Sequence, residues 1–417
     1  MIKPTILAMI LAGSRVGELG VLTHYRPKSA VPFGGFARVI DFPLSNLLHS
    51  GIERVAILSQ YRSYSLINHI GTGAAWDMVG RNRGISILPP FKDYESPDWY
   101  RGSADAVYQN FDFIRYHNPA NLLILSGDHV YNMDYQEMIQ YHNDTNADLT
   151  AAFIKIDKQA ASRFGIAEIA DDSVKGGKML SYEEKPLNPK GDWASLTVFC
   201  FKPEVLYKVL RENQQNDSYE FGRDIIPLMM EQNYTVHGYK FAGYWGYTKT
   251  IDEYWQTSMD LLGSEPKIDM ERWGIRTNLT HRNISGCQPL KVGYSGSFEN
   301  SMAYNGCIVE GTVRNSILFP GVRVEKGAEI VDSVLFFNNH VQEGAKLCRV
   351  VSDVNTTFGQ NTQIGVPGKE GPGNVSVVGW NNKVPGGTTI GSGCTVAPCI
   401  DEFRWPERAI KDGEELQ

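Results

Sequence analysis

Short apolar runs without polar alternation recur along the first part of the chain. Three of them, Thr5–Ala12, Val55–Leu58 and Leu122–Ser126, are rich in residues that favour β-structure. An apolar run with no polar face is typical of a strand that helices cover on both sides. We therefore expect a buried, mostly parallel sheet.

Helical periodicity separates these runs. Helices are expected over Met133–Ala147, from Ser103 onward, and after Thr250, where Glu253 completes the spacing of a capping box. Their apolar faces comprise Met138, Ile139 and His142; Val107, Phe111 and Ile114; and Tyr254, Trp255, Met259 and Leu262, respectively. Strands alternating with helices over about the first 260 residues predict a doubly wound α/β domain.

The pattern changes after Leu262. Residues 264–300 are rich in Ser, Asn, Gly and Pro and are interpreted as a linker with one anchored patch, Trp273–Thr277. Beyond the linker a six-residue rhythm appears, for example in Gly321 and Gly327 and in Val322, Ala328 and Val334.

This rhythm, with aliphatic side chains pointing inward and Gly at the corners, predicts a parallel β-helix. Because the register slips between repeats, a sandwich of short strands is the alternative. The expected boundaries are 1–263 for an α/β domain, 264–300 for the linker, and 301–417 for the β-helix and tail. Stacked coils leave their end rungs open, so subunit contact through this domain is expected.

Composition narrows the class of protein. A chain of 417 residues is too long for one ordinary core, and Lys+Arg 40 against Asp+Glu 47 gives no basic field for nucleic acid. Its 6 cysteines include no C-x-x-C pair, so reduced, buried thiols in a cytoplasmic protein are expected. No apolar run approaches the ~20 residues of a membrane span. The start of the chain imitates a secretory signal, but the polar turn that follows it argues against one.

Candidate chemistry begins where the first strand ends. Leu11, Ala12 and Gly13 lead into a polar turn, and Arg26-Pro-Lys28 follows. Backbone amides and cations at the carboxyl edge of a sheet are suited to binding phosphate, which predicts a nucleotide site. A structural strand with a functionless turn is the alternative.

Motifs spread over nearly the whole chain resemble those of the glucose-1-phosphate adenylyltransferase (ADP-glucose pyrophosphorylase) family. The resemblance rests on Pro32-Phe-Gly-Gly, Arg38-Val-Ile-Asp-Phe, Leu44-Ser-Asn46, Ser59-Gln60-Tyr61, Trp99–Ala106 (WYRGSADA), Ser126-Gly-Asp-His129, Phe164-Gly165, Glu184-Lys-Pro186, Phe221-Gly-Arg-Asp224 and the Trp273 patch. WYRGSADA and SGDHVY are its most specific parts.

The resemblance implies a Rossmann-like sugar-nucleotidyltransferase domain followed by a left-handed β-helix. It implies adenylyl transfer from ATP to glucose 1-phosphate, giving ADP-glucose and pyrophosphate for glycogen or starch synthesis. Mg²⁺, allosteric control and a tetramer are implied as well. Since phosphate oxygens attack and leave, such a protein chiefly positions its reactants and neutralises charge.

The same resemblance assigns roles to individual residues. Asp128 resembles the metal-binding aspartate, and Lys28 a catalytic lysine. Substrate contacts are expected from Tyr100, Gly165, Glu184, Lys185 and Ser195, and nucleotide contacts from Leu11, Ala12, Gly13, Gln60 and Gly127. Alternatives stay open: Asp128 as a turn cap, Lys185 in a solvated ion pair, and Tyr100 as core packing.

Four positions depart from the motifs of the family. Where the family has L-A-G-G-x-G-[ST]-R-L, this chain has Ser14 and Val16 for two glycines and Glu18 for an arginine. Tyr247 stands where the family has a second metal-binding aspartate. An anion beside a triphosphate is repulsive, so these changes predict a weak or inactive catalyst.

Two further departures concern the ligands. Thr197 replaces a glycine near the expected sugar site, and Phe36 replaces a lysine associated with the activator. Three hypotheses follow: an active adenylyltransferase; a regulatory subunit of a homo- or hetero-tetramer that pairs with an active paralogue; and a sugar-phosphate or nucleotide binding module. No nucleic acid or membrane partner is expected.

Overall fold

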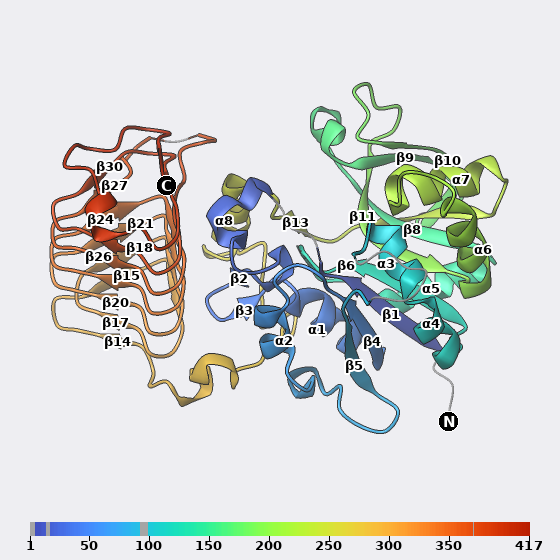
Figure 1. The fold of residues 1–417 in the computed structure, drawn as a ribbon, viewed down its shortest axis with the longest axis horizontal. Helices are drawn as coiled ribbons and strands as arrows, with labels where there is room; N and C mark the ends of the chain where they lie inside the picture. Colours follow the sequence, from blue (N-terminus) through green and yellow to red (C-terminus); the bar gives the residue numbers. More distant parts are fainter. Residues whose placement is uncertain (1–4, 14–16, 92–98, 370) are drawn as a thin grey trace. The chain divides into compact units, whose positions relative to one another are not determined.

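The computed structural model describes residues 5–13, 17–91, 99–369 and 371–417 (Figure 1). Ser14 and Val16, two of the departures above, lie outside the described residues. The chain divides into two compact units. The first unit comprises Met1–Ser14, Phe42–Ser63 and Ile70–Trp245, and the second unit comprises Arg15–Asp41, Tyr64–His69 and Gly246–Gln417. Each is described by itself.

A nine-stranded sheet forms the centre of the first unit, in the order β5-β4-β1-β6-β11-β8-β12-β10-β9. In that order the strands are Gly84–Leu88, Arg54–Leu58, Ile6–Leu11, Asn121–Ser126, Trp193–Phe201, Leu149–Lys155, Val236–Phe241, Gly176–Glu184 and Gly165–Ile169. The three apolar runs form β1, β4 and β6, as predicted. Short β7 (His129–Tyr131) follows β6, and β13 spans Trp245–Tyr247.

The directions of the strands differ from the expected mostly parallel sheet. β5, β4, β1 and β6 are parallel, and so are β8 and β12, but β11 pairs antiparallel with both β6 and β8. β10 is antiparallel to β9 and β12. A strand that is buried on both faces shows a continuous apolar run whether it is parallel or antiparallel to its neighbours. Periodicity alone therefore cannot predict the direction of the strand.

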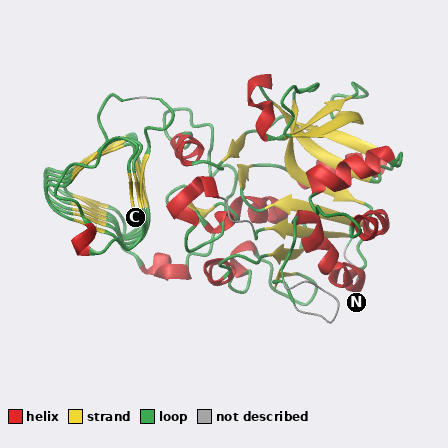
Figure 2. Cartoon of the chain, turned by 45° about the horizontal axis from the view of Figure 1, so that its top comes forward, coloured by secondary structure: helices red, strands yellow, loops and turns green. Residues whose placement is uncertain are grey.

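Helices pack around this sheet, as Figure 2 shows. They are α1 (Asp41–His49), α3 (Ser103–Gln109), α4 (Phe111–His117), α5 (Tyr135–Asp144), α6 (Pro203–Asn213) and α7 (Ile226–Glu231), with short turns η3 (Ala74–Trp76), η4 (Lys158–Arg163) and η5 (Phe221–Ile225). Helix α2 (Tyr64–Ile70) belongs to the second unit except for its last residue. α5 confirms the helix expected within 133–147: Asp134 caps it, and Met138, Ile139 and His142 are buried.

The single helix expected from Ser103 onward is wrong, because the chain forms two. α3 carries Val107, whereas α4 carries Phe111 and Ile114. Asn110 lies between them with φ −100° and ψ 19°, outside helical values. Its side-chain amide donates to the carbonyl of Ala106 at 2.8 Å, which satisfies that carbonyl where the helix stops.

The N-terminal segments of the second unit are η1 (Gly17–Thr23), η2 (Lys28–Ala30), β2 (Pro32–Phe33) and β3 (Ala37–Arg38). The predicted capping box is confirmed: Thr250 accepts from the Glu253 amide, Glu253 accepts from the Thr250 amide, and α8 (Ile251–Met259) follows. The expected apolar residue Leu262 lies beyond the end of α8.

Three parallel sheets make up the rest of the second unit. The first contains β14 (Lys291–Val292), β17 (Ile308–Val309), β20 (Arg323–Val324), β23 (His340–Val341), β26 (Thr357–Phe358) and β29 (Lys383–Val384). The second contains β15 (Ser297–Glu299), β18 (Thr312–Arg314), β21 (Glu329–Val331), β24 (Lys346–Cys348), β27 (Gln363–Ile364) and β30 (Thr389–Ile390). The third contains β16 (Met302–Ala303), β19 (Ile317–Leu318), β22 (Val334–Leu335), β25 (Val350–Ser352), β28 (Ser376–Val378), β31 (Thr395–Val396) and β32 (Glu415–Leu416).

These sheets are the three sides of a left-handed parallel β-helix, seen almost end-on in Figure 2. Each strand pairs in parallel with the strand one coil further on, as in Val313 with Ile330 and Ile330 with Leu347. The residues of the six-residue rhythm point inward, since Val322, Ala328 and Val334 are buried. The β-helix prediction is therefore confirmed over the sandwich alternative.

The segment expected as a linker has buried anchors. Ile268, Met270, Ile275 and Ile284 are buried, and η6 (His281–Gly286) lies within it. The first rung strands, β14 and β15, already lie at 291–299. This segment is thus better ordered than its polar composition suggests, because a few apolar side chains are enough to hold it in place.

The cysteines are free, as expected, but they are not all buried. Cys200, Cys307, Cys348 and Cys394 are buried, Cys287 is half-buried and Cys399 is exposed. Burial raises the pKa of Cys307 to about 11, so its thiol stays protonated near neutral pH. In the ranges given above, no helix combines the length and the apolar character that crossing a bilayer requires.

Candidate active site

The five predicted nucleotide residues meet at one edge of the first unit's sheet. β4, β1 and β6 are adjacent and parallel, and Leu11 is in register with both Leu58 and Ser126. The Ala12 amide donates to the Leu58 carbonyl and the Gly127 amide to the Leu11 carbonyl, each at 2.9 Å. The structure therefore brings together the following predicted residues at this carboxyl edge: Leu11, Ala12, Gly13, Gln60, Gly127 and Asp128.

Glycine is required at this edge by close backbone approach. A Cβ atom at Gly127 would lie 2.9 Å from Cγ2 of Ile10 and 3.1 Å from the Leu11 carbonyl oxygen. At Gly13 it would lie 3.0 Å from the Gln60 amide nitrogen. Neither position has room for a side chain, so both turns present backbone rather than side-chain atoms.

Asp128 follows β6 directly and has a partly accessible carboxylate, 15% exposed. The Ser126 hydroxyl donates to its Oδ1 atom, and Nε2 of His129 lies 3.5 Å from the same oxygen. A carboxylate at this edge is the type of oxygen donor that a hard divalent cation takes. Across the described ranges, no group of three or more His, Cys, Asp or Glu side chains could hold a metal ion.

Gln60 and Tyr100 are bonded to each other rather than open to a ligand. The Gln60 amide accepts from the Tyr100 backbone at 2.8 Å and donates to the Tyr100 carbonyl at 3.2 Å. The Tyr100 ring is buried, with its hydroxyl donating to Leu88 and accepting from Asn110. Burial raises the pKa of Tyr100. The buried position of Tyr100 agrees with the alternative that its side chain packs in the core.

The predicted sugar residues form a second cluster in the first unit. Gly165 at the start of β9 lies opposite Glu184 at the end of β10, and Ala194 of β11 lies opposite Ile166. Lys185 follows with φ 51°, and its backbone amide donates to Phe164 at 2.9 Å. Three strand ends therefore gather Gly165, Glu184, Lys185 and Ser195 in one place.

Two glycines shape the surroundings of Glu184. A Cβ atom at Gly165 would lie 1.9 Å from the Tyr182 hydroxyl, and one at Gly222 would lie 2.4 Å from Oε2 of Glu184. The Tyr182 hydroxyl donates to that same Oε2 at 3.0 Å. Burial, aided by the Glu184 carboxylate, raises the pKa of Tyr182 well above its usual value, so the phenol remains a donor.

His129 connects the two clusters, and the sequence interpretation gave it no role. Its Nδ1 lies 3.2 Å from the Leu196 carbonyl, between Ser195 and Thr197. Its ring packs edge-on against Trp245, with centroids 5.3 Å apart. Tyr182, Gly222 and Trp245 were missed in the same way. For His129 and Gly222 the sequence did contain a signal, because both residues lie within the quoted motifs.

The Ser195 to Thr197 segment is a bulge in β11. Register shifts between Ser195 and Phe199, and Ser195 Oγ accepts from the Thr197 amide at 3.2 Å. Thr197 has φ 54°, in the left-handed region that disfavours a β-branched residue. The branched side chain noted in the sequence thus occupies a position whose backbone suits glycine.

In the second unit, Lys28 and Tyr247 are neighbours. Lys28 is only 2% exposed, and its Nζ lies 5.2 Å from the centroid of the Tyr247 ring. Such a cation–π contact replaces the attraction that a carboxylate at 247 would supply. The catalytic role of Lys28 stays a prediction.

Two charges expected to meet phosphate have protein partners instead. Arg26 forms a buried ion pair with Asp353, so its guanidinium is not a free cation for a ligand. Oε1 of Glu18 lies 3.2 Å from Nζ of Lys249. Glu18 therefore has a cation partner within the second unit, and the predicted effect of this residue on catalysis stays a prediction. Phe36 stacks on Tyr304, with centroids 4.9 Å apart.

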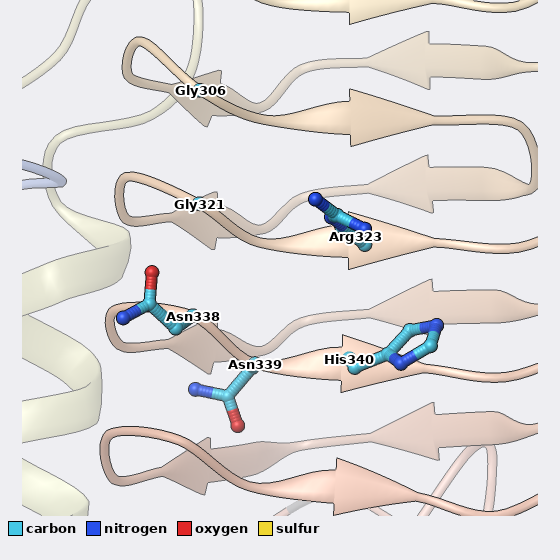
Figure 3. A pocket seen from close by; sticks show the side chains of 6 residues that line it. All are labelled: Gly306, Gly321, Arg323, Asn338, Asn339 and His340. Atoms are coloured by element: carbon cyan, nitrogen blue, oxygen red, sulfur yellow. The ribbon is translucent and has the colours of Figure 1, made fainter. Parts of the chain in front are cut away.

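A polar pocket on the β-helix lies outside the predicted site (Figure 3). It has a volume of about 370 Å³ and is lined by Gly306, Gly321, Arg323, Asn338, Asn339 and His340. Asn339 is committed to the fold, donating to the carbonyls of Phe336 and Asp353. The lining contains none of the site residues that were predicted from the sequence.

Comparison with known proteins places these features in a family. Residues 7–264 match the nucleotidyl transferase family and residues 290–379 the GlmU-like C-terminal hexapeptide family. Glucose-1-phosphate adenylyltransferase of Acetivibrio thermocellus is 37% identical over 432 residues, covering 100% of this chain and 98% of that protein.

Two further proteins of the same name are similar. That of Desulforamulus reducens is 39% identical, covering 94% of this chain and 98% of its own. The Clostridium botulinum protein is 43% identical, and the matched region covers 79% of this chain and 84% of that protein. With full-length similarity and both domain types in the same order, this chain belongs to the glucose-1-phosphate adenylyltransferase family.

Proposed function

We propose that this chain transfers an adenylyl group from ATP to glucose 1-phosphate. A phosphate oxygen of glucose 1-phosphate bonds to the α-phosphorus of ATP, the bond from that phosphorus to the bridging oxygen breaks, and pyrophosphate leaves. The observation that carries the proposal is the shared carboxyl edge of β4, β1 and β6, where the turn after Leu11 adjoins Asp128. Ligands of α/β sheets bind at such edges.

The chain's own residues act by binding and orienting the reactants. The close-packed turns at Gly13 and Gly127 direct backbone atoms towards the nucleotide. Glu184, held by Tyr182, is placed to accept from sugar hydroxyls. The Ser195 hydroxyl lies in the same cluster, and the exposed ammonium of Lys185 can pair with the sugar phosphate. Fixing both substrates in line supplies much of the rate acceleration.

Nucleotidyl transferases typically use a divalent metal ion, and we propose Mg²⁺ for this chain. Asp128 fits such an ion, because Mg²⁺ is commonly bound by one or two carboxylates together with substrate phosphates and water. Its carboxylate is accessible and lies at the phosphate edge. When bound, the ion would neutralise charge on the phosphates.

We also propose a tetramer that assembles through the β-helix, as either a homo-oligomer or a hetero-oligomer with a paralogue. The first coil supports this proposal, because Val292 and Tyr294 there are exposed. A cytoplasmic location is proposed on the free thiols. Mass in solution, measured for the full chain and in the presence of a candidate paralogue, tests the assembly.

The activity test is pyrophosphate release by the purified full chain with ATP, Mg²⁺ and glucose 1-phosphate. Release that depends on the sugar phosphate, with ADP-glucose formed in equal amount, is the expected result. Asp128→Asn should lower the rate by about 10²-fold or more, since it removes a charge that acts in the transition state.

Asp112→Asn is the matched control, because the Asp112 side chain is 96% exposed and pairs with Arg115 at 3.5 Å. It should leave the rate unchanged. A folded wild-type chain that forms no ADP-glucose would contradict the proposed function. Substrate binding without turnover would then favour the regulatory or binding-module hypothesis.

A further inference from the structure

We propose that His129 is a positioning residue, which holds the backbone of the sugar cluster at a fixed place relative to the Asp128 carboxylate. The sugar cluster consists of the predicted residues Gly165, Glu184, Lys185 and Ser195. The proposal rests on the proposed adenylyl transfer, and every group that carries it belongs to the first unit. His129 is only 5% exposed, so it acts through its neighbours rather than by touching a substrate.

Strand β11 leaves its regular pairing close to the candidate site. The ladder between β11 and β6 ends at the pair of Val198 with Leu125. Beyond this pair, the register of β11 against β8 shifts between Ser195 and Phe199. Backbone groups in such a bulge have no regular partner in the sheet. Leu196 is fully buried there, so its carbonyl must be satisfied by a donor outside the ladder.

His129 supplies that donor. Its Nδ1 lies 3.2 Å from the Leu196 carbonyl oxygen. Because a carbonyl oxygen only accepts, Nδ1 carries the proton in this hydrogen bond. Leu196 lies between Ser195, a predicted sugar contact, and Thr197, whose φ of 54° turns the bulge. One side chain therefore fixes the backbone that presents the Ser195 hydroxyl.

The same residue is tied to the candidate metal-binding carboxylate. His129 follows Asp128 directly, so their Cα atoms are about 3.8 Å apart. Nε2 of the His129 ring lies 3.5 Å from Oδ1 of Asp128. A single rigid, buried ring thus spans the distance from the carboxylate to the bulge. This matters for the reaction, because in-line transfer needs both reactants in a fixed geometry.

Aromatic packing makes a second connection to the sugar cluster. The His129 ring meets Trp245 edge-on, with centroids 5.3 Å apart and planes at 89°. Trp245 packs in turn on Phe164, with centroids 5.2 Å apart. The Phe164 carbonyl accepts from the Lys185 amide at 2.9 Å. His129 is therefore connected to the backbone at both Ser195 and Lys185.

Two amide substitutions distinguish the two ring nitrogens of His129. Asparagine places its amide where Nδ1 lies, whereas glutamine reaches towards Nε2 and leaves the Leu196 carbonyl without its donor. In the full chain with ATP, Mg²⁺ and glucose 1-phosphate, His129→Gln should raise KM for glucose 1-phosphate about tenfold, the effect of one lost hydrogen bond. KM for ATP should not change. His129→Asn should keep both KM values close to those of the wild type.

His142→Gln is the matched control, because His142 is a buried histidine of the same unit that lies outside the sugar cluster. Its Nδ1 is 2.9 Å from the Thr150 hydroxyl, so the substitution breaks a comparable contact. It should leave both KM values unchanged, and any fall in its melting temperature then reports stability alone. Wild-type KM values in His129→Gln, or equal increases in His129→Gln and His129→Asn, would overturn the proposal.

Trp245→Leu provides a second test that does not depend on the folding of His129→Gln. This substitution breaks the aromatic connection and leaves the hydrogen bond of His129 in place. It should raise KM for glucose 1-phosphate and leave KM for ATP unchanged. An unchanged KM for glucose 1-phosphate, or an equal rise for both substrates, would count against the positioning role.

Wild-type turnover is measured first, so that failure of the proposed function is seen separately. If the wild type forms no ADP-glucose, calorimetry with glucose 1-phosphate replaces the rate measurement. Binding weakened about tenfold in His129→Gln, and retained in His129→Asn, would support the positioning role in a non-catalytic chain. Equal binding in the two variants, or no binding to the wild type, would refute it.

Discussion

Arg26 and Asp353 are 327 residues apart in sequence and form a buried ion pair of 2.8 Å in the second unit. Arg26 also donates to the Leu22 carbonyl, and Oδ1 of Asp353 accepts from the Val354 amide. Both charges are therefore satisfied, and the pair ties the segment after the first strand to the β-helix within one unit.

Removing one partner of this pair should destabilise the protein strongly. Arg26→Met leaves the Asp353 carboxylate buried without its cation, which typically costs about 3–5 kcal/mol. The double variant Arg26→Met with Asp353→Leu should lose much less, because no charge remains buried. Urea denaturation of the single and double variants measures the difference. Additive losses would show that the two residues do not interact as described.

Gly165 should not tolerate even a methyl group. In Gly165→Ala the new Cβ would overlap the Tyr182 hydroxyl and displace Glu184, at a typical cost of about 1–3 kcal/mol. The affinity for glucose 1-phosphate, measured by calorimetry, should fall with it. Gly84→Ala is the control, since the nearest neighbour of a Cβ atom at that position, Nη1 of Arg54, would be 3.8 Å away. Normal affinity in Gly165→Ala would separate this cluster from sugar binding.

Thr197→Gly should stabilise the chain. Relief of a non-glycine residue at φ 54° is worth about 1–3 kcal/mol, partly offset by about 0.5–1 kcal/mol of extra freedom in the unfolded chain. Thr280→Gly, at φ −77°, should instead destabilise. Thermal melting checks both variants. A lower melting temperature for Thr197→Gly would mean that its side chain makes contacts worth more than the strain.

Stability should fall in mild acid partly because of His142. Burial lowers the pKa of His142 to about 4 in the folded state, against about 6.5 when unfolded. Between these values the unfolded chain binds more protons, so stability decreases as pH falls from about 6.5 to about 4, by up to about 3 kcal/mol. Its Nδ1 lies 2.9 Å from the Thr150 hydroxyl.

His142→Gln should flatten this pH dependence, whereas His49→Gln at an exposed position should not. Urea denaturation at pH 7, 5.5 and 4.5 gives the comparison. The same slope in His142→Gln and wild type would assign the acid sensitivity to other groups, such as His281, whose pKa burial lowers to about 3.

Much of the candidate site was predictable because its signals are local. Gly13 and Gly127 mark close backbone approach at strand ends. Asp128 directly follows an apolar run, so it is expected at the carboxyl edge of the sheet. The Glu184 motif likewise ends a strand. Tyr100 was harder, because a tyrosine next to an exposed Trp99 gives no sign of which way its ring points.

The sequence by itself determined which segments form strands, where the β-helix coils repeat, and how α8 begins, because these follow from side-chain periodicity and from hydrogen bonds between near neighbours. Only the tertiary structure decided the antiparallel half of the sheet, the partner of Arg26 and the pairing of Glu18 with Lys249. Each of these depends on groups that are distant along the chain, and a charge has no fixed consequence until its neighbour in space is known.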